Sequence, residues 1–166
     1  MKKLLLGLFL VSSALAFSAR VVKSTETVLK DNLIYVGEET TPYTGVIETY
    51  NEQEILLEKT EFKNGLRDGS SKKYFINGGK VSLEAIFSNG IQVGVQKRYY
   101  ESGELLSELS YKNGKMDGIG KSYYQNGQVE MEEPYKNGER DGVIKVYDEN
   151  GKLIRQATFK NGQQVK

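Results

Sequence analysis

Two carboxylates stand side by side at Glu132 and Glu133, and two further acidic residues, Asp117 and Asp141, each precede a glycine. Adjacent carboxylates can perform acid–base catalysis when a desolvating pocket moves their pKa values apart. Asp-Gly pairs occur in calcium loops, but neither pair here is followed by the run of oxygen ligands that an EF-hand loop contains. The Asp-Gly pairs are therefore interpreted as turn residues, and the role of the glutamates depends on the fold that positions them.

The other common routes to catalysis need residue types that the chain lacks. It contains no histidine and no cysteine, so it has neither the commonest general base, nor a thiol nucleophile, nor soft metal ligands. We therefore expect no enzymatic activity, no cofactor and no metal. Without cysteine the chain also has no disulfide framework and cannot carry the lipidated cysteine of a bacterial lipoprotein.

Tyrosine and lysine recur at a spacing that could build a binding surface. Five tyrosines each follow a glycine by five residues, and four lysines each precede one of these tyrosines by two residues. We predict a candidate partner-binding face formed by Tyr50, Tyr74, Tyr99, Tyr123, Tyr147, Lys72, Lys97, Lys121 and Lys145. The same periodicity favours a second interpretation, in which the rings pack between repeated units and the lysines pair with acidic residues on a solvated face.

These residues belong to an internal repeat. The octets YKNGKMDG at 111–118 and YKNGERDG at 135–142 nearly repeat FKNGLRDG at 62–69, and weaker copies begin at Phe87 and Phe159. Periods of roughly 20 to 50 residues mark stacked supersecondary units that each contact only their neighbours. We therefore predict a repeat array instead of one thick core.

Each unit contains two short strand-like runs. In the unit at 118–141 the runs are separated by Asn126-Gly127, a dipeptide typical of two-residue type I′ hairpin turns. The Lys-Asn-Gly segments are expected to form longer turns, and the earliest hairpin turn, at residues 51–54, has no glycine and is expected to turn less tightly. The runs are too short for a crossover helix between them, so the strands are predicted to form an antiparallel meander.

Counting outward from a two-residue turn predicts the register. Tyr123 falls opposite Glu130, and Lys121 falls opposite Glu132. The position of this second pair is filled in the other units by Glu48 with Lys59, Lys72 with Glu84, Lys97 with Glu108, and Lys145 with Gln156. Because cross-strand charge pairs contribute only about 0.2–1 kcal/mol each, they serve mainly as evidence for the register.

Apolar residues fall on both faces of the predicted strands. Leu56, Leu105 and Val129 share one face with the aromatic residues of the octets, and the tyrosine ladder lines the other. A two-layer sandwich would instead alternate between a buried and a wet face. We therefore predict an all-β fold, an elongated single-layer antiparallel meander of repeated β-hairpins, preceded by an N-terminal signal helix.

The first residues, MKKLLLGLFLVSSALAFSA, have the layout of a secretory signal peptide: two lysines, an apolar run and small residues ending at Ala16. The apolar run is too short to span a membrane, which needs about 20 residues. We predict a cleaved signal peptide over 1–16, a flexible leader over 17–27, N-terminal capping strands over 28–45 and about five 24-residue units over 46–166. The exported product is expected to be soluble in the periplasm, outside the cell or at the cell surface.

The charge balance argues against a polyanionic partner. Cleavage after Ala16 removes two of the 23 basic residues and leaves 21 against 22 acidic residues, a formal charge of −1. Proteins that bind nucleic acid gather a basic excess on one face, whereas both signs are interspersed along this chain. We therefore expect no nucleic-acid partner, and the charge gives little support to binding at a membrane surface.

The tandem Tyr/Phe-x-Asn-Gly pattern, with its recurring glycine and tyrosine, resembles the MORN-repeat variant of bacterial exported proteins, some of which are grouped as antitoxin-like. The resemblance covers about residues 28–166, and TPYTG at 41–45 is similar to the Pro-aromatic-Thr-Gly segment that often opens the family's first unit. It implies an elongated antiparallel sheet with a binding or scaffolding role, and no catalytic residues.

The leading hypothesis is an exported repeat scaffold that mediates protein–protein interaction at the cell envelope or surface. An alternative, implied by the resemblance, is an antitoxin or immunity-like protein that neutralises a toxic partner, although a signal peptide argues against a cytoplasmic partner. A second alternative is peripheral lipid binding, for which a basic or amphipathic surface would be expected.

Overall fold

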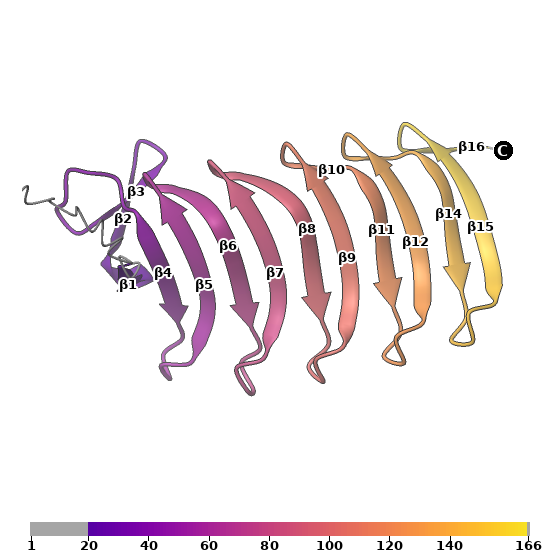
Figure 1. Cartoon of the computed structure of the whole chain (residues 1–166), viewed down its shortest axis with the longest axis horizontal. Helices are drawn as coiled ribbons and strands as arrows, with labels where there is room; N and C mark the ends of the chain where they lie inside the picture. The colour runs from indigo at the N-terminus through magenta and orange to yellow at the C-terminus, as the bar shows by residue number, and fades with distance from the viewer. Residues whose placement is uncertain (1–19, 166) are drawn as a thin grey trace, which may run out of the picture.

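The chain forms a long, curved β-sheet, seen face-on in Figure 1. The computed structural model describes residues 20–165, and within them lie sixteen β-strands, one short 3₁₀ helix, η1 (Ser24–Glu26), and no α-helix. The predicted all-β fold is confirmed for this part of the chain. The predicted signal peptide over 1–16, with its helix, lies outside the described residues.

The strands of the main sheet follow one another in chain order. Along its length lie β1 (Val21–Lys23), β4 (Gly45–Tyr50), β5 (Leu56–Lys63), β6 (Leu66–Tyr74), β7 (Val81–Ser88), β8 (Ile91–Tyr99), β9 (Leu105–Lys112), β11 (Gly118–Tyr123), β12 (Val129–Lys136), β14 (Gly142–Tyr147), β15 (Leu153–Lys160) and β16 (Gln163–Val165). Two short strands, β10 (Lys115–Met116) and β13 (Glu139–Arg140), pair with β9 and β12. The predicted antiparallel meander is confirmed from β4 onward.

The tight two-residue turns occur at the Lys-Asn-Gly segments, where longer turns were predicted. Asn113 and Gly114 both have positive φ, 52° and 77°, and the neighbouring Lys112 and Lys115 are paired. Both residues have positive φ at each of the five Asn-Gly pairs that close this end of the sheet. A type I′ turn has this signature because both central residues must take positive φ.

The predicted two-residue turn at Asn126-Gly127 is wrong. The Tyr124 amide donates to the Gln128 carbonyl at 2.9 Å and the Gly127 amide to the Tyr124 carbonyl at 2.9 Å, so the loop has three residues. Only its last residue, Gly127, has positive φ, at 84°. This is the type I turn with a G1 bulge, the other common short hairpin connection.

The longer loop changes the register near the turn but not beyond it. Tyr123 lies opposite Val129, so the predicted pairing of Tyr123 with Glu130 is wrong. A β-bulge then leaves Glu130 as one extra residue on β12, which compensates for the extra loop residue. The predicted pairing of Lys121 with Glu132 is therefore confirmed.

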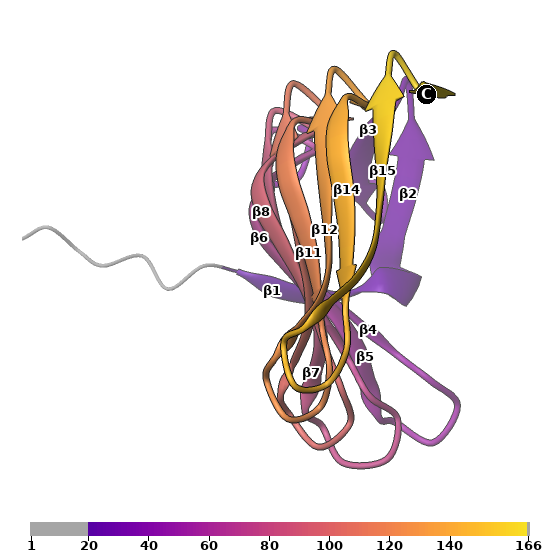
Figure 2. The same ribbon diagram turned by 90° about the vertical axis from the view of Figure 1, so that its right-hand side faces the viewer.

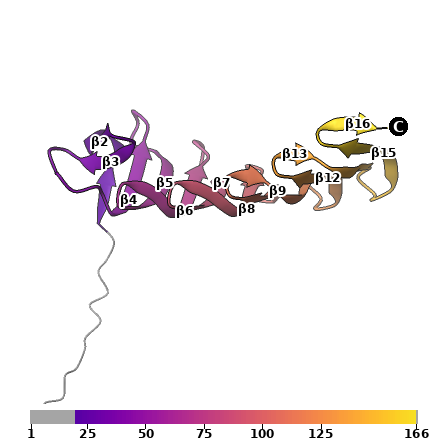
Figure 3. The same cartoon turned by 90° about the horizontal axis from the view of Figure 1, so that it is seen from above.

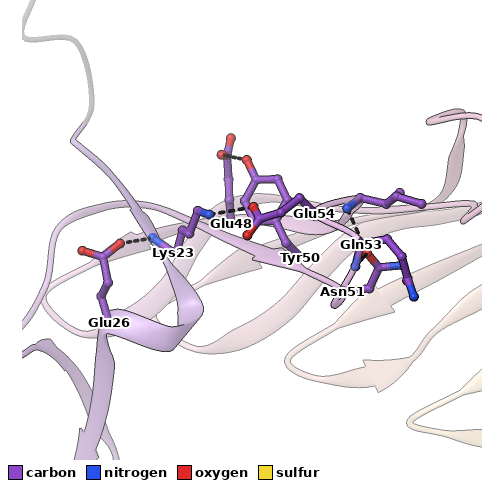
Figure 4. Close-up of polar contacts among 8 residues, drawn as sticks. Lys23, Glu26, Glu48, Tyr50, Asn51, Gln53 and Glu54 are labelled. Carbon is purple, nitrogen blue, oxygen red and sulfur yellow. Dashed lines mark hydrogen bonds and ion pairs between the residues drawn. The ribbon is translucent and has the colours of Figure 1, made fainter.

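The earliest hairpin turn is as tight as the others, contrary to prediction. The Asn51 amide donates to the Ile55 carbonyl at 3.0 Å, and the Glu54 amide donates to the Asn51 carbonyl at 3.1 Å. Glu54 takes the place of the usual glycine with φ of 58°. In Figure 4 the Asn51 side chain reaches into the turn, where its oxygen accepts the Gln53 and Ile55 amides and thereby stabilises it.

Each type I′ turn and the residues that follow it form a short arm, over 63–67, 88–92, 112–116, 136–140 and 160–164. The arms are joined by hydrogen bonds from a turn glycine amide to the carbonyl of the preceding arm: Gly90 to Arg67 at 2.8 Å, Gly114 to Gln92 at 3.0 Å, Gly138 to Met116 at 2.8 Å and Gly162 to Arg140 at 2.9 Å. Gly65 donates in the same way to Tyr43. This bonding pattern of the repeat therefore already includes Tyr43, in the predicted cap.

The two faces of the sheet differ, because successive residues of a strand point to opposite sides. We call the ladder face the one that carries Glu48, Lys72, Lys97, Lys121 and Lys145, and the arm face the one that carries Phe62, Phe87, Tyr111, Tyr135 and Phe159. Figure 3 shows β10, β13 and β16 on the same side of the sheet as β2 and β3. The arms thus fold toward the arm face.

At its N-terminal end the sheet has a second layer, which corrects the single-layer prediction there. The hairpin of β2 (Thr27–Lys30) and β3 (Leu33–Val36) forms a separate two-stranded sheet, and Figure 2 shows it beside the main sheet. Its Val36 joins Val22, Tyr43 and Ile47 in a buried cluster, against which Ile34 and Phe62 pack. The hairpin therefore covers the arm face instead of pairing with the edge strand.

The edge strand is capped by residues predicted to be a flexible leader. Of the predicted leader 17–27, the described residues from 20 onward form β1, η1 and the start of β2. β1 pairs with β4 in parallel, the one parallel pair among the described strands. Val22 is only 6% exposed, so its burial against Tyr43 and Ile47 orders a segment that has no periodic pattern of its own.

Candidate interaction faces

The structure brings all nine predicted partner-binding residues to the ladder face. The lysines stand in one row across the sheet, and the register alternates them with glutamates in the order Lys72, Glu84, Lys97, Glu108, Lys121, Glu132 and Lys145. The row begins with Lys23 on β1, followed by Glu48 and Lys59 of the first unit. In this unit the glutamate lies on the first strand and the lysine on the second. Lys59 lies opposite Lys72, so the alternation fails once, at the first inter-unit junction.

Most of these charges are partnered within the fold. The Nζ-to-carboxylate distance is 2.8 Å for Lys72 and Glu84 and 3.8 Å for Lys121 and Glu132. In the first unit it is 2.9 Å for Lys59 and Glu48. These side chains are partly exposed, so each pair contributes little to stability. The ladder therefore forms a regular pattern of charge, but it adds little to the free energy of unfolding.

The tyrosine hydroxyls also bond to the glutamates of this row. Donor–acceptor pairs run from Tyr50 to Glu48 at 2.6 Å, Tyr99 to Glu84 at 2.8 Å, Tyr123 to Glu108 at 2.7 Å and Tyr147 to Glu132 at 3.2 Å. Figure 4 shows the first of these bonds, with Lys23 near the same ring. The last three bonds join consecutive units, so the rings do serve as packing between repeats.

The ladder perturbs the acidity of its members. Burial, with help from Glu84 and Glu108, raises the pKa of Tyr99 and of Tyr123 to about 12. The Lys72 ammonium and the Tyr99 hydroxyl lower the pKa of Glu84. In the first unit the Tyr50 hydroxyl and Lys59 lower the pKa of Glu48. Each shift favours the neutral tyrosine beside an ionised glutamate.

The arm face carries a groove that sequence reasoning missed. One section, of about 350 Å³, runs over β8 to β12 and is lined by Leu109, Met116 and Met131. The next, of about 280 Å³, runs over β12 to β15 and includes Ile144 and Arg155. Met131 and Glu133 line both sections. The two sections are therefore continuous along the C-terminal half of the sheet.

A charged cluster lies where the two sections meet. Glu133 is only 12% exposed at its side chain, and its carboxylate accepts hydrogen bonds from the Tyr135 hydroxyl at 2.6 Å and from Nε of Arg140. The Arg140 guanidinium also lies 5.6 Å from the centre of the Phe159 ring. Burial, reinforced by Glu133, raises the pKa of Tyr135. The cluster joins β12 to the fourth arm through the contact of Glu133 with Arg140.

This geometry excludes the acid–base pair that adjacency in sequence suggested. Glu132 belongs to the ladder face, beside Lys121, and Glu133 to the arm face, beside Arg140. Consecutive strand residues point to opposite sides of the sheet, so the two carboxylates cannot act on one substrate.

The floor of the groove depends on a glycine within a strand. A Cβ at Gly120 would lie 2.8 Å from Cδ1 of Leu109 and 3.5 Å from Cε2 of Tyr135. The equivalent residues of the other units are Ile47, Ser71, Gln96 and Ile144, so this position varies along the array and only Gly120 leaves it without a side chain. In the sequence, the groove could have been indicated only by such variable positions and by the charged residue Glu133.

The Asp-Gly aspartates connect neighbouring arms. Asp68 accepts the Asn89 amide at 2.9 Å, and Asp117 accepts the Asn137 amide at 3.2 Å. Asp141 forms an ion pair with Lys160 at 3.0 Å. Within residues 20–165 no group of His, Cys, Asp or Glu side chains could hold a metal ion.

Comparison with known families gives two matches, which together span four stretches of the array. Residues 92–113, 116–137 and 140–161 match the family described as MORN repeat variant, and residues 61–80 match the family described as MORN repeat. No curated protein matches the chain significantly. The part of the chain that the structure describes contains no helix of the length and apolarity needed to cross a membrane.

Proposed function

The chain is a MORN-repeat protein, and we propose that it is an exported scaffold that binds an acidic, partly apolar segment of a protein partner in the arm-face groove. MORN repeats suggest a scaffold for protein or membrane interaction. The finer proposal has two parts. A protein ligand held on one face is supported by features of the arm face, and a location at the cell envelope or surface is supported by the N-terminal sequence.

The arm face already binds one segment of the chain. At the N-terminal end of the sheet the arm face already binds a polypeptide segment, the hairpin β2–β3, through Ile34 and Val36 against Ile47 and Phe62. The groove continues this face over β8 to β15, with Leu109, Met131 and Ile144 among its lining residues. The arm face is thus covered by a hairpin at its N-terminal end, whereas over β8 to β15 no segment of the described chain covers it.

The lining residues indicate what kind of segment would bind. Met116 and Met131 have adaptable apolar side chains of the type used at peptide-binding surfaces. Arg98 and Arg155 line the two sections, and among the described residues neither forms an ion pair. Arginine pairs well with carboxylates. An acidic segment with apolar side chains would therefore match both the floor and the charge of the groove.

Export is supported by the N-terminal sequence alone, with its two lysines, apolar run and Ala16. Fractionation of producing cells, with sequencing of the mature N-terminus, tests it. We expect the protein outside the cytoplasm with Phe17 as its first residue. Recovery of intact Met1 in the cytoplasm would contradict export, while leaving the binding proposal to its own test.

Site-specific photo-crosslinking tests the groove. A photo-reactive residue at Met131, on the arm face, should capture the partner, and one at Lys97, on the ladder face, should not. Binding of the purified captured protein should then weaken for Arg98→Glu and Arg155→Glu. The matched control is Lys152→Glu, which makes the same charge change in a turn. Equal capture from both faces, or equal weakening by the control, would contradict the groove as the site.

A further inference from the structure

We infer that the ladder face is a self-association surface, on which a second copy of the chain packs with its own ladder face. This inference is independent of the ligand proposed for the groove, because the two surfaces lie on opposite sides of the sheet. It rests on an exposed apolar stripe and on the order of charges beside that stripe.

The stripe runs across the strands of the ladder face, next to the charged row. It contains Ile86, Val95, Ile119, Pro134 and Val143, each two residues from a charge of the ladder. Ile119 is 56% exposed, Ile86 is 49% exposed, and the two valines are 40% exposed. Ile119, Pro134 and Val143 line one shallow hollow of about 300 Å³. On β9 the position between Val95 and Ile119 is Ser110, so the stripe has two apolar parts. Exposed apolar patches mark interaction surfaces.

The order of the charges selects the partner. From Lys72 to Lys145 the signs of the row alternate without a break. Two sheets packed face to face about a two-fold axis parallel to the strands place each row on a reversed copy of itself. A row of alternating charges meets its reversed copy with opposite signs when that axis lies between two strands.

The position of that axis decides whether the charges attract. An axis through the middle strand β9 would set every charge against a like charge. An axis between β9 and β11 sets Glu108 against Lys121, Lys97 against Glu132 and Glu84 against Lys145, so all six charges face opposite charges. Complementary charges fix register and exclude wrong pairings. An axis between β8 and β9 would also oppose six charges, but it would set Lys59 against Lys145. The row therefore favours the register centred between β9 and β11.

The same axis brings the apolar stripe together. Val95 then faces Pro134 of the second copy, and Ile86 faces its Val143, while Ile119 lies near the axis and faces its Ser110. Aligned sheets pack about 10 Å apart and are rotated by about 30° because of their twist, so contacts near the axis are the closest. The grooves of the two copies would face outward, giving one dimer two binding sites.

Charge reversal in two separate variants tests this arrangement. Lys97→Glu and Glu132→Lys each place a like charge opposite the second copy, twice per dimer. Within one chain the two residues are not neighbours, since β9 and β11 lie between their strands. Sedimentation velocity should show each variant dimerising about tenfold or more weakly than the parent, which corresponds to about 1.4 kcal/mol. An equimolar mixture should dimerise like the parent, because each copy then supplies the charge that the other lost.

The mixture separates association from folding, because mixing cannot repair a folding defect in either chain. Circular dichroism and thermal unfolding of each variant serve as the control for the fold. A parent that remains monomeric at every concentration would overturn the inference, as would a mixture that stays as weak as its components. Binding of the monomeric parent to lipid vesicles, lost in Ile119→Glu, would instead assign this face to a membrane.

Discussion

The two faces of the sheet are made from the same strands, yet they follow different rules. On the ladder face a tyrosine, with a charged residue two positions before it, returns in every unit. Each glutamate from Glu84 to Glu132 accepts a tyrosine hydroxyl from the next unit. On the arm face the equivalent positions change from Ser71 to Gly120 to Ile144. The repeated residues thus build the array, while the residues that vary between units shape its groove.

The largest effect is expected where the ladder joins two units. Tyr123→Ala should lower the free energy of unfolding by about 2–3 kcal/mol, because the half-buried ring and its bond to Glu108 are lost. Tyr123→Phe keeps the ring and should cost only about 1 kcal/mol. Urea unfolding measures both.

Partner binding distinguishes the two faces in these variants. Tyr123→Phe should bind the groove ligand as the parent does, since its hydroxyl lies on the opposite face. Binding weakened about tenfold at unchanged stability, equivalent to about 1.4 kcal/mol, would identify the tyrosine ladder as the ligand site and reverse the assignment of the faces.

A smaller loss is expected on the arm face from Gly120→Val. The new Cβ would meet Leu109 at 2.8 Å, and overpacking of this kind costs about 1–3 kcal/mol. The side chain would also fill the groove floor, so ligand binding should fall along with stability. The matched control is Ile119→Val, one residue away on the ladder face, which should change the unfolding free energy by less than about 0.5 kcal/mol. Equal effects of the two changes would show that the faces are not distinct.

The features predicted from sequence are those that depend on near neighbours. The period, the antiparallel order and the pairing of Lys121 with Glu132 follow from strand alternation and the spacing of the turns. The predicted turn types are interchanged because Asn-Gly occurs at both ends of three of the units, with hairpin-turn copies at 77–78, 126–127 and 150–151. At Asn126-Gly127 a bulge on the partner strand accommodates a three-residue loop, which a count along one hairpin does not show.

The features missed from sequence depend on contacts between distant segments. β1 is ordered by the burial of Val22 against Tyr43, 21 residues later in the chain. The groove requires the arms to fold over one face, which happens where the chain passes through positive φ at residues such as Gly118 and Gly142. Glu133 then meets Arg140 across that bend. No local pattern shows which way the arms fold.

The ladder should also give the protein a sensitivity to alkali. The pKa values of Tyr99 and Tyr123 are raised to about 12 in the folded chain, compared with about 10 in the unfolded chain. A raised pKa contributes stability that is fully present below about pH 10 and is lost as the pH rises toward about 12. The melting temperature should therefore fall over this interval, and the tyrosinate absorbance of the folded protein should show two groups that titrate late. In the double variant Tyr99→Phe/Tyr123→Phe both signals should diminish, whereas an unchanged titration would contradict the burial of these hydroxyls.

The smallest effect concerns the charge pair that established the register. Lys121 and Glu132 lie opposite each other at 3.8 Å, with side chains about one-third exposed, so their coupling should be no more than about 0.5 kcal/mol. Lys121→Glu and Glu132→Lys should each destabilise the fold slightly, because each places a like charge beside its partner and beside the next member of the row. The combined swap restores the pair itself, but it leaves the introduced carboxylate next to Glu108 and the introduced ammonium next to Lys145. It should therefore recover only part of the loss.

Urea unfolding at a protein concentration where the chain is monomeric isolates this coupling from contacts with a second copy. If the unfolding free-energy changes of the two single variants simply add in the double variant, Lys121 and Glu132 have no direct coupling.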